Sequence, residues 1–251
     1  MGAVYTIWLR DMKWFIRSKA RVVSMFVTPF MWLAIIGTGL SGVVGEIPGS
    51  GNYLNFLAPG VVGMAVLFTS TMTGVSVLWD KQFGFMKEIL VAPVSRTSVM
   101  FGKAMGGATI GMLQGSMLLV AAALIGAKMP GVDGFLLAVL FMLLISLTFV
   151  SIGLAFASKI DDPIAFPIVM NFFLLPVFFL SGAIFPLNTA PSWMRFIGYV
   201  NPLTYGVDGL RGSISGALAA RFPIWLDLVV LALFGLAMVS FGGYLFKKIK
   251  A

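Results

Sequence analysis

The segment WDKQFGFMKEILVAPVSRTSVMFGK, residues 79–103, is a charged stretch between two long apolar ones. Residues 52–78 before it and residues 104–127 after it carry no charged side chain. Each flank is long enough to cross a bilayer, which takes about 20 apolar residues. The charged stretch must therefore lie in water or at the lipid headgroups.

A short helix is expected inside this stretch, ended by Pro93, which cannot continue a helix. On a helical wheel its apolar residues fall on two separate stripes. Such a helix could rest one stripe on the membrane domain and offer the other to a groove on a soluble partner. The alternative is an ordinary loop helix with scattered apolar residues. The two stripes are Phe83, Met86 and Leu90, and Phe85 and Ile89.

The composition identifies the class of protein. Hydrophobic residues make up 59% of the 251 residues and charged residues only 10%, whereas soluble domains carry about 25% charge. The sequence therefore predicts an integral membrane protein. The net charge of +8 comes from residues that bracket apolar runs and form no stripe for nucleic acid. Cysteine and histidine are absent, which excludes thiol redox chemistry and imidazole ligation, and no metal site is expected.

We expect a single all-α membrane domain over residues 1–251, with an N-terminal interfacial helix over 1–21 and six transmembrane helices. A coupling region is expected over 80–96, and a re-entrant region on the other side of the membrane over 182–221. The predicted spans are 22–43, 54–78, 101–125, 135–157, 163–181 and 223–246.

The N-terminal segment reads as an amphipathic helix along the inner leaflet. Val4, Trp8 and Phe15 share one side of the wheel, and Arg10 and Lys13 lie on the opposite, basic side, which would face anionic headgroups. A simple basic flank of the first span is the other interpretation.

The distribution of charge sets the topology. With six spans, most of the 17 Lys and Arg residues fall on one side of the membrane. By the positive-inside rule that side is the cytoplasm, so both termini and the charged stretch are cytoplasmic and residues 182–221 are external.

Polar residues within the spans indicate where a path could lie. Thr69, Thr73 and Ser76 gather near one end of the second span, and Asn171 lies between two prolines in the fifth. These side chains could form a weakly polar wall of a translocation path. Equally, the hydroxyls could bond their own helix and Asn171 could be buried among neighbours.

Two further patterns concern packing. Gly102 and Gly106, and Gly107, Gly111 and Gly115, give the third span two ridges of small residues, within the subunit or across a dimer. In the external region we expect two short helices, the second capped by Asn201 with Pro202 at its first position. Asp208 and Arg211, at i and i+3 of that helix, can pair.

Two stretches of the sequence resemble a known family. The stretches FLAPGVVGMAVLFTSTMTGVSVLWDKQFGFMKEILVAPVSR, residues 56–96, and FLSGAIFPLNTAPSWMRFIGYVNPLTYGVDGLRG, residues 179–212, resemble ABC-2 type exporter permeases. The likeness is strongest to the drug-resistance branch typified by daunorubicin exporters.

The resemblance implies the membrane half of an ATP-driven exporter. A coupling helix would dock in a cassette ATPase through Asp80, Phe83, Phe85, Met86, Lys87, Glu88 and Leu90. The external gate would comprise Asn201, Pro202, Tyr205, Asp208 and Arg211. The Gly102–Gly107 segment GKAMGG lacks the order of a phosphate-binding loop. The chain would therefore hold no cofactor, and two copies of a partner cassette would bind ATP and magnesium.

The expected function is ATP-driven export of hydrophobic or amphipathic molecules, such as drugs, antibiotics or lipids, across the cytoplasmic membrane of a prokaryote. A single set of six spans supplies half a pathway, so a second copy of the permease is expected, most simply a homodimer. The alternatives are a lipid-linked polysaccharide exporter of the same architecture, and a passive channel or membrane scaffold. An intramembrane enzyme is disfavoured because no acid/base pair lies at membrane depth.

Overall fold

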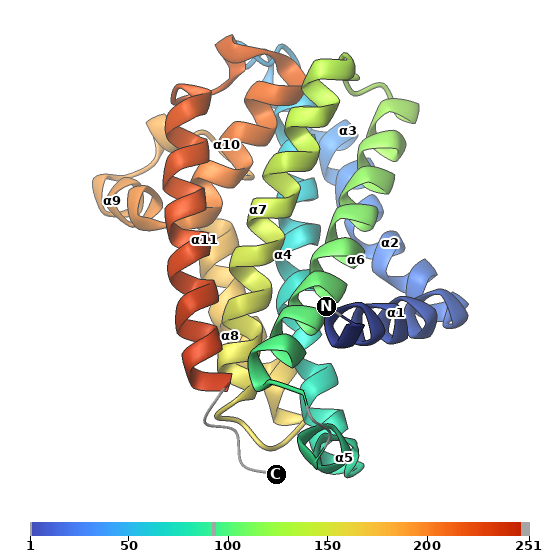
Figure 1. Ribbon diagram of the computed structural model, residues 1–251. Helices are drawn as coiled ribbons and strands as arrows, with labels where there is room; N and C mark the ends of the chain where they lie inside the picture. Colours follow the sequence, from blue (N-terminus) through green and yellow to red (C-terminus); the bar gives the residue numbers. More distant parts are fainter. Residues whose placement is uncertain (1, 92–93, 247–251) are drawn as a thin grey trace.

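The computed structural model describes residues 2–91 and 94–246, and within them the chain forms helices and no strand (Figure 1). Most helices run along one axis, whereas α1 lies across the others near one end and α5 lies beyond that same end. In chain order the elements are α1 (Gly2–Arg17), α2 (Lys19–Trp32), the π-helical segment η1 (Leu33–Gly37), α3 (Thr38–Val44), α4 (Tyr53–Gln82), α5 (Phe85–Val91), α6 (Arg96–Leu124), α7 (Val132–Ala157), α8 (Ala165–Phe179), η2 (Leu187–Thr189), α9 (Ser192–Val200), α10 (Pro202–Ser215), η3 (Ala217–Ala219) and α11 (Ile224–Phe246).

Five helices are long and apolar enough to cross a membrane. They confirm the all-helical membrane class expected from composition. The span near the N-terminus is built from α2, η1 and α3 in one continuous run. The five are Val22–Val44, Tyr53–Gln82, Arg96–Leu124, Val132–Ala157 and Ile224–Phe246.

The fifth predicted span, 163–181, is shorter in the structure. Helix α8 has 15 residues, which rise about 22 Å and fall short of a hydrocarbon core of about 30 Å. At its start the Asp162 carboxylate accepts a hydrogen bond from the Ile164 amide (2.8 Å) in a turn that precedes the helix. After its end the chain turns at Gly182, whose φ of 76° favours glycine.

Three shorter helices, α8, α9 and α10, instead return the chain from one end of the bundle to the other. Lys81 Nζ donates to the Ala157 carbonyl (3.1 Å), so α7 ends beside the end of α4 that leads to α5. Lys128 Nζ donates to the Ser215 carbonyl (3.1 Å), so α10 ends at the opposite end, where α11 begins (Figure 1). The segment that contains α8, α9 and α10 thus makes this crossing in pieces, because prolines and glycines interrupt it.

Helix α4 forms the centre of the core and packs on α6, α7, α8 and α10. It meets α7 at two facing glycines. A Cβ added at Gly153 would lie 2.2 Å from the Thr71 carbonyl oxygen, and one added at Gly74 would lie 2.6 Å from the Gly153 carbonyl oxygen. No side chain fits between these backbones, so the contact requires glycine.

The small-residue ridges of α6 pack within the subunit. A Cβ at Gly107 would lie 2.4 Å from the Thr73 hydroxyl of α4, and one at Gly115 would lie 2.6 Å from the Met142 sulfur of α7. The other ridge faces α1, since a Cβ at Gly102 would lie 2.8 Å from Ile7. Of the two possibilities left by the sequence, these contacts show packing inside one chain.

Replacing Gly153 by alanine is expected to lower the free energy of unfolding by about 1–3 kcal/mol, because the new methyl group forces α4 and α7 apart. The midpoint of thermal unfolding in detergent measures this. Gly39→Ala is the matched control: a Cβ there has no neighbour within 4 Å, and the change should be neutral or slightly stabilising. Equal midpoints for the two variants would contradict the close approach.

Candidate coupling helix and transport cavity

A sharp bend at Gly84 separates α5 from α4. Gly84 has φ of 77°, in the left-handed region that favours glycine. The coupling region 80–96 is therefore more than one helix. Asp80 lies on α4, and Phe83 is the residue that ends α4. The predicted stripe of Phe83 and Met86 is wrong, because the bend places these residues on two different elements.

Helix α5 has one buried and one open side. Met86 is 1% exposed and belongs to the main hydrophobic core, whereas Phe85 is 49% exposed. Glu88 is also exposed, and Phe83, just before the bend, is 75% exposed. The side chains of Lys87, Ile89 and Leu90 lie outside the described part of the structure. Met86 thus anchors α5 to the bundle while Phe85 and Glu88 remain open to a partner.

Asp80 is turned into a group of four charged side chains, which we call the ion cluster. Its members are Arg10 and Asp11 of α1, Asp80 of α4 and Lys103 of α6. The Asp80 carboxylate lies 2.8 Å from Lys103 Nζ and 2.8 Å from Arg10 Nη2. Lys103 Nζ also donates to the Ser76 hydroxyl (2.9 Å) and lies 3.5 Å from the Asp11 carboxylate. The cluster therefore joins three helices.

The ion cluster is largely withdrawn from water. Lys103 is 1% exposed, and the Asp11 and Asp80 side chains are 12% and 16% exposed. Burial lowers the pKa of Arg10, but its hydrogen bond to Asp80 and the charges of Asp80 and Asp11 outweigh burial and leave that pKa above the ordinary value. Arg10 is therefore expected to keep its positive charge within the cluster.

Helix α1 packs against α6. Trp8 Nε1 donates to the Thr109 hydroxyl (3.1 Å), and Met12 and Phe15 are buried. Lys13 and Arg17 are exposed, as expected for the basic face of an interfacial helix. Arg10, assigned to that face from the sequence, instead points toward α4.

Arg10 also connects the ion cluster with α5. Its guanidinium carbon lies 5.6 Å from the centre of the Phe85 ring, within the range of a cation–π contact. Between α1 and α5 lies a cavity of about 580 Å³, the α1–α5 cavity. It is lined by Arg10, Asp11, Trp14, Ser76, Trp79, Asp80, Phe83, Phe85 and Lys103.

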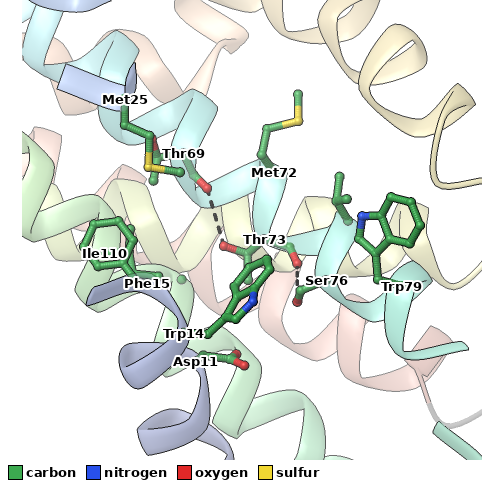
Figure 2. Close-up of a pocket in the computed structure, with 12 residues that line it drawn as sticks. Asp11, Trp14, Phe15, Met25, Thr69, Met72, Thr73, Ser76, Trp79 and Ile110 are labelled. Atoms are coloured by element: carbon green, nitrogen blue, oxygen red, sulfur yellow. Dashed lines mark hydrogen bonds between the residues drawn. The ribbon is translucent and has the colours of Figure 1, made fainter. Parts of the chain in front are cut away.

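A second cavity, of about 250 Å³, lies next to it; we call it the α1–α4 cavity (Figure 2). Thr69, Thr73 and Ser76, predicted from the sequence, follow one another along α4 and all line it. Each hydroxyl also donates a hydrogen bond: Thr73 to the Thr69 carbonyl (3.4 Å), Ser76 to the Thr73 carbonyl (2.8 Å) and Thr69 to Gln114 of α6. The rest of the lining is mostly apolar and comes from α1, α2, α4 and α6.

Asn171 lies elsewhere. It is on α8 with an exposed side chain, and it does not line the α1–α4 cavity. Its neighbours on the helix, Ile168 and Phe172, are 69% and 84% exposed. The structure of one chain therefore separates Asn171 from the three hydroxyls with which the sequence grouped it.

The residues predicted for an external gate hold the region around α10 together. The Asn201 side chain accepts from the Leu203 amide (3.0 Å) and donates to the Val177 carbonyl of α8 (2.6 Å), and Pro202 opens α10. Tyr205 donates its hydroxyl to the Tyr199 carbonyl of α9 (2.7 Å). These bonds connect α8, α9 and α10.

Asp208 and Arg211 form the expected pair, 3.8 Å apart and both buried. Asp208 also accepts hydrogen bonds from the Arg221 and Phe222 amides (2.8 Å each). Arg211 donates to the Phe56 carbonyl of α4 (3.3 Å) and lies over the Phe56 ring (3.8 Å). The pair thus fastens α10 to α4 and to the segment before α11.

The sequence did not single out Lys103, Asp11, Gln114 or Asp227 as site residues. Lys103 and Gln114 are polar residues within the long α6 run, which was a usable signal, but their partners lie on other helices. Asp227 is fully buried, and neither of its carboxylate oxygens has a hydrogen-bond partner in the described part of the chain. Across residues 2–91 and 94–246, acidic side chains form no group of three that could hold a metal ion.

Comparison with known proteins agrees with this architecture. Residues 2–215 match the family described as ABC-2 type transporter. A protein of Cyanophora paradoxa that carries the name transport permease ycf38 is 30% identical, over 94% of this chain and 85% of its own length. The inner membrane transport permease YadH of Escherichia coli strain K12 is 26% identical (85% and 83%), and nodulation protein J of Rhizobium leguminosarum bv. viciae is 24% identical (89% and 86%). The chain is a multi-pass membrane protein and belongs to the ABC-2 type transporter permease family.

Proposed function

We propose that this chain is the transmembrane subunit of an ATP-driven exporter, which moves hydrophobic or amphipathic molecules such as drugs, antibiotics or lipids out of the cell. Family membership implies association with an ATP-binding cassette subunit. The observation that carries the proposal is α5, a short helix anchored by buried Met86, with Phe85 open beyond the end of the bundle. Such a helix can receive force from a soluble motor.

In the proposed arrangement the α5 end of the bundle faces the cytoplasm of a prokaryotic cell, because the basic residues gather there. Helix α1 lies in the inner-leaflet interface, and both termini are cytoplasmic. The segment from α8 to α10 makes the remaining crossing, with α9 and α10 forming the external re-entrant region. Irregular backbone at membrane depth is tolerated there because protein surrounds it, as the burial of α10 illustrates.

The proposed mechanism is alternating access. ATP binding would bring two cassettes together, and each α5 would move with its cassette. The ion cluster would pass that movement to α1, α4 and α6, around the α1–α4 cavity. Substrate would contact Thr69, Thr73 and Ser76, and leave after the contacts of Asn201, Pro202, Tyr205, Asp208 and Arg211 rearrange. ATP and magnesium would be bound by the two cassettes.

The working unit would contain two copies of this permease. Asn171 supports this, since an exposed amide on an apolar helix face is costly in lipid and needs a partner. A second copy placed against α8 would cover Asn171, Ile168 and Phe172 and bring both Asn171 side chains to the shared path.

The experiment is reconstitution of the permease with its cassette in lipid vesicles, followed by ATP-dependent movement of a panel of fluorescent amphiphiles. Movement that requires both ATP and the permease is expected. Leakage independent of ATP would instead indicate a passive channel. Movement of a lipid-linked saccharide alone would favour the polysaccharide exporter.

Filling the α1–α4 cavity should block the path. Ile110 of α6 lines the cavity, so Ile110→Trp is expected to reduce transport about tenfold, equivalent to about 1.4 kcal/mol, while the variant still copurifies with the cassette. The control is Met117→Trp, two turns further along α6, where the side chain is 51% exposed. Equal transport by both variants would remove this cavity from the path.

A further inference from the structure

Helix α2 contains a carbonyl that lacks the regular amide donor four residues later. Pro29 lies inside α2, and its nitrogen carries no hydrogen to donate to the carbonyl four residues earlier, which is that of Met25. Gln114 of α6 replaces the missing donor, because its Nε2 donates a hydrogen bond to the Met25 carbonyl at 2.6 Å. A side chain of another helix thus replaces the missing hydrogen bond of α2.

The same amide is held from α4. The Thr69 hydroxyl donates to Gln114 Oε1, and Gln114 is only 6% exposed. A glutamine at membrane depth needs partners for both ends of its amide, and here they come from two different helices. Gln114 therefore joins α2, α4 and α6 at a single point.

That point separates two cavities. The α1–α4 cavity lies on one side, and on the other is a cavity of about 350 Å³ that extends to α8, here named the α2–α8 cavity. Met25 and Thr69 line both cavities, and Gln114 lines the second. The hydrogen-bonded group of these three residues is thus the wall between the cavities.

Helix α2 is the less buried side of this wall. In the most apolar 18-residue stretch of each span, 17% is buried for Val22–Val44, against 72% for α4. The span also contains Pro29 and the π-helical segment η1, both of which are sites where helices bend. Loss of one hydrogen bond at Met25 would leave little to keep α2 straight at this level.

We propose that Gln114 is a latch on α2: when it releases the Met25 carbonyl, α2 bends at Pro29 and the two cavities merge into one groove for an elongated amphiphile. The identity of the occupant rests on the transport function proposed above. Trp79 and Met64, at the two ends of the merged groove, are fifteen residues apart on α4, or about 22 Å. That length suits an extended hydrocarbon chain better than a compact ring system.

The two ends of the groove differ in chemistry. The α1–α4 cavity shares Asp11, Trp14, Ser76 and Trp79 with the α1–α5 cavity and so opens toward the ion cluster, which contains two basic and two acidic side chains. The α2–α8 cavity is lined mainly by apolar side chains, including Phe68 and Leu175. A single-chain amphiphile with a zwitterionic head matches this order, with its head near the cluster and its tail toward α8.

The latch can be tested without any transport assay. The chain has no native cysteine, so Val27→Cys on α2 and Leu113→Cys on α6, both at positions 45% exposed, can carry spin labels. In vesicles, with labelled chain diluted by unlabelled chain, one narrow distance distribution is expected for the parent. Gln114→Leu should raise the ratio of open to closed α2 about tenfold and broaden the distribution. An unchanged distribution would overturn the latch.

Pro29→Ala provides the rescue. Alanine restores an amide hydrogen for the Met25 carbonyl, so the Gln114→Leu/Pro29→Ala chain should regain the narrow distribution, and Pro29→Ala alone should be at least as narrow as the parent. Pro29→Ala keeps the test decisive even if Gln114→Leu does not fold. A broader distribution in Pro29→Ala would contradict the hinge.

The occupant is tested with a lysophosphatidylcholine that carries a photoreactive diazirine near the end of its acyl chain. Labelling of the peptide around Phe68 or Leu175 should increase several-fold in Gln114→Leu and decrease in Pro29→Ala. Labelling confined to the α1–α4 cavity in all variants would overturn the merged groove. Both measurements use the full chain without ATP, so a failure of export leaves them standing, and their failure leaves export untouched.

Discussion

Lys103→Met is expected to lower the free energy of unfolding by about 3–5 kcal/mol, because it leaves two carboxylates in a buried cluster with one fewer cation. Lys103 is 1% exposed and lies 2.8 Å from Asp80 and 3.5 Å from Asp11. Its hydrogen bond to Ser76 would be lost as well. Thermal or chemical unfolding in detergent, with yield of folded protein as a second measure, gives the result.

Lys81→Met is the matched control. Lys81 also pairs with a carboxylate, but its partner Asp161 is 91% exposed at 3.2 Å, and exposed ion pairs contribute about 0–1 kcal/mol. The Lys81 side chain is 14% exposed and also donates to the Ala157 carbonyl, a hydrogen bond that contributes about 0.5–1.5 kcal/mol, so the expected loss is about 1–2 kcal/mol. The two substitutions remove the same charge at the same end of the bundle. Similar losses for both would show that burial of the ion cluster does not decide stability. Adding Asp80→Asn to the Lys103→Met chain should recover part of the lost free energy of unfolding, because it removes one of the two carboxylates.

Phe85→Ala is expected to uncouple ATP hydrolysis from export while leaving the permease folded. The side chain is 49% exposed and contributes little to the core, but it is the open aromatic residue of α5. The number of molecules exported per ATP hydrolysed by the reconstituted complex should fall about tenfold or more. Truncating an aromatic anchor in an interface costs about 2 kcal/mol or more of binding free energy. Glu88→Arg, which reverses an exposed charge on the same helix, should act in the same direction.

The control for this experiment is Phe241→Ala on α11, where the ring is 52% exposed, close to the 49% of Phe85, and has no part in the proposed path. It should leave the ratio of export to hydrolysis close to that of the parent if α5 alone receives the cassette. Unchanged coupling in both Phe85→Ala and Glu88→Arg would refute the docking assignment. A complex that assembles but hydrolyses ATP without export would support it.

The membrane class and most of the helices could be predicted from the sequence, because uncharged runs of more than 20 residues have few alternatives. The start of α10 and its ion pair could also be predicted, because their signals lie close together in the sequence. Asn201 caps the helix, Pro202 opens it, and Asp208 pairs with Arg211 three residues later. Each of these contacts joins residues close in sequence, so neighbours alone determine them.

The sequence could not show which distant segments meet at a residue. Asp80 was predicted to dock in a cassette ATPase, and the structure adds that Arg10 and Lys103 from two other helices bind its carboxylate. Thr69 and Asn171 were grouped by polarity, yet only Thr69 lines the α1–α4 cavity. Helix periodicity specifies which side of its own helix a residue occupies, but not which helix packs on that side.

The sequence by itself determined that this protein is helical and lies in the membrane, because hydrophobicity and helix signals act over a few neighbouring residues. Only the tertiary structure decided that the charged residues of three helices form one buried cluster, and that Gln114 completes the hydrogen bonding of α2. Those contacts between helices join residues 23 to 92 positions apart, and no local pattern encodes such a meeting. These residues meet because of the way the helices pack, and glycines at the helix crossings permit that packing.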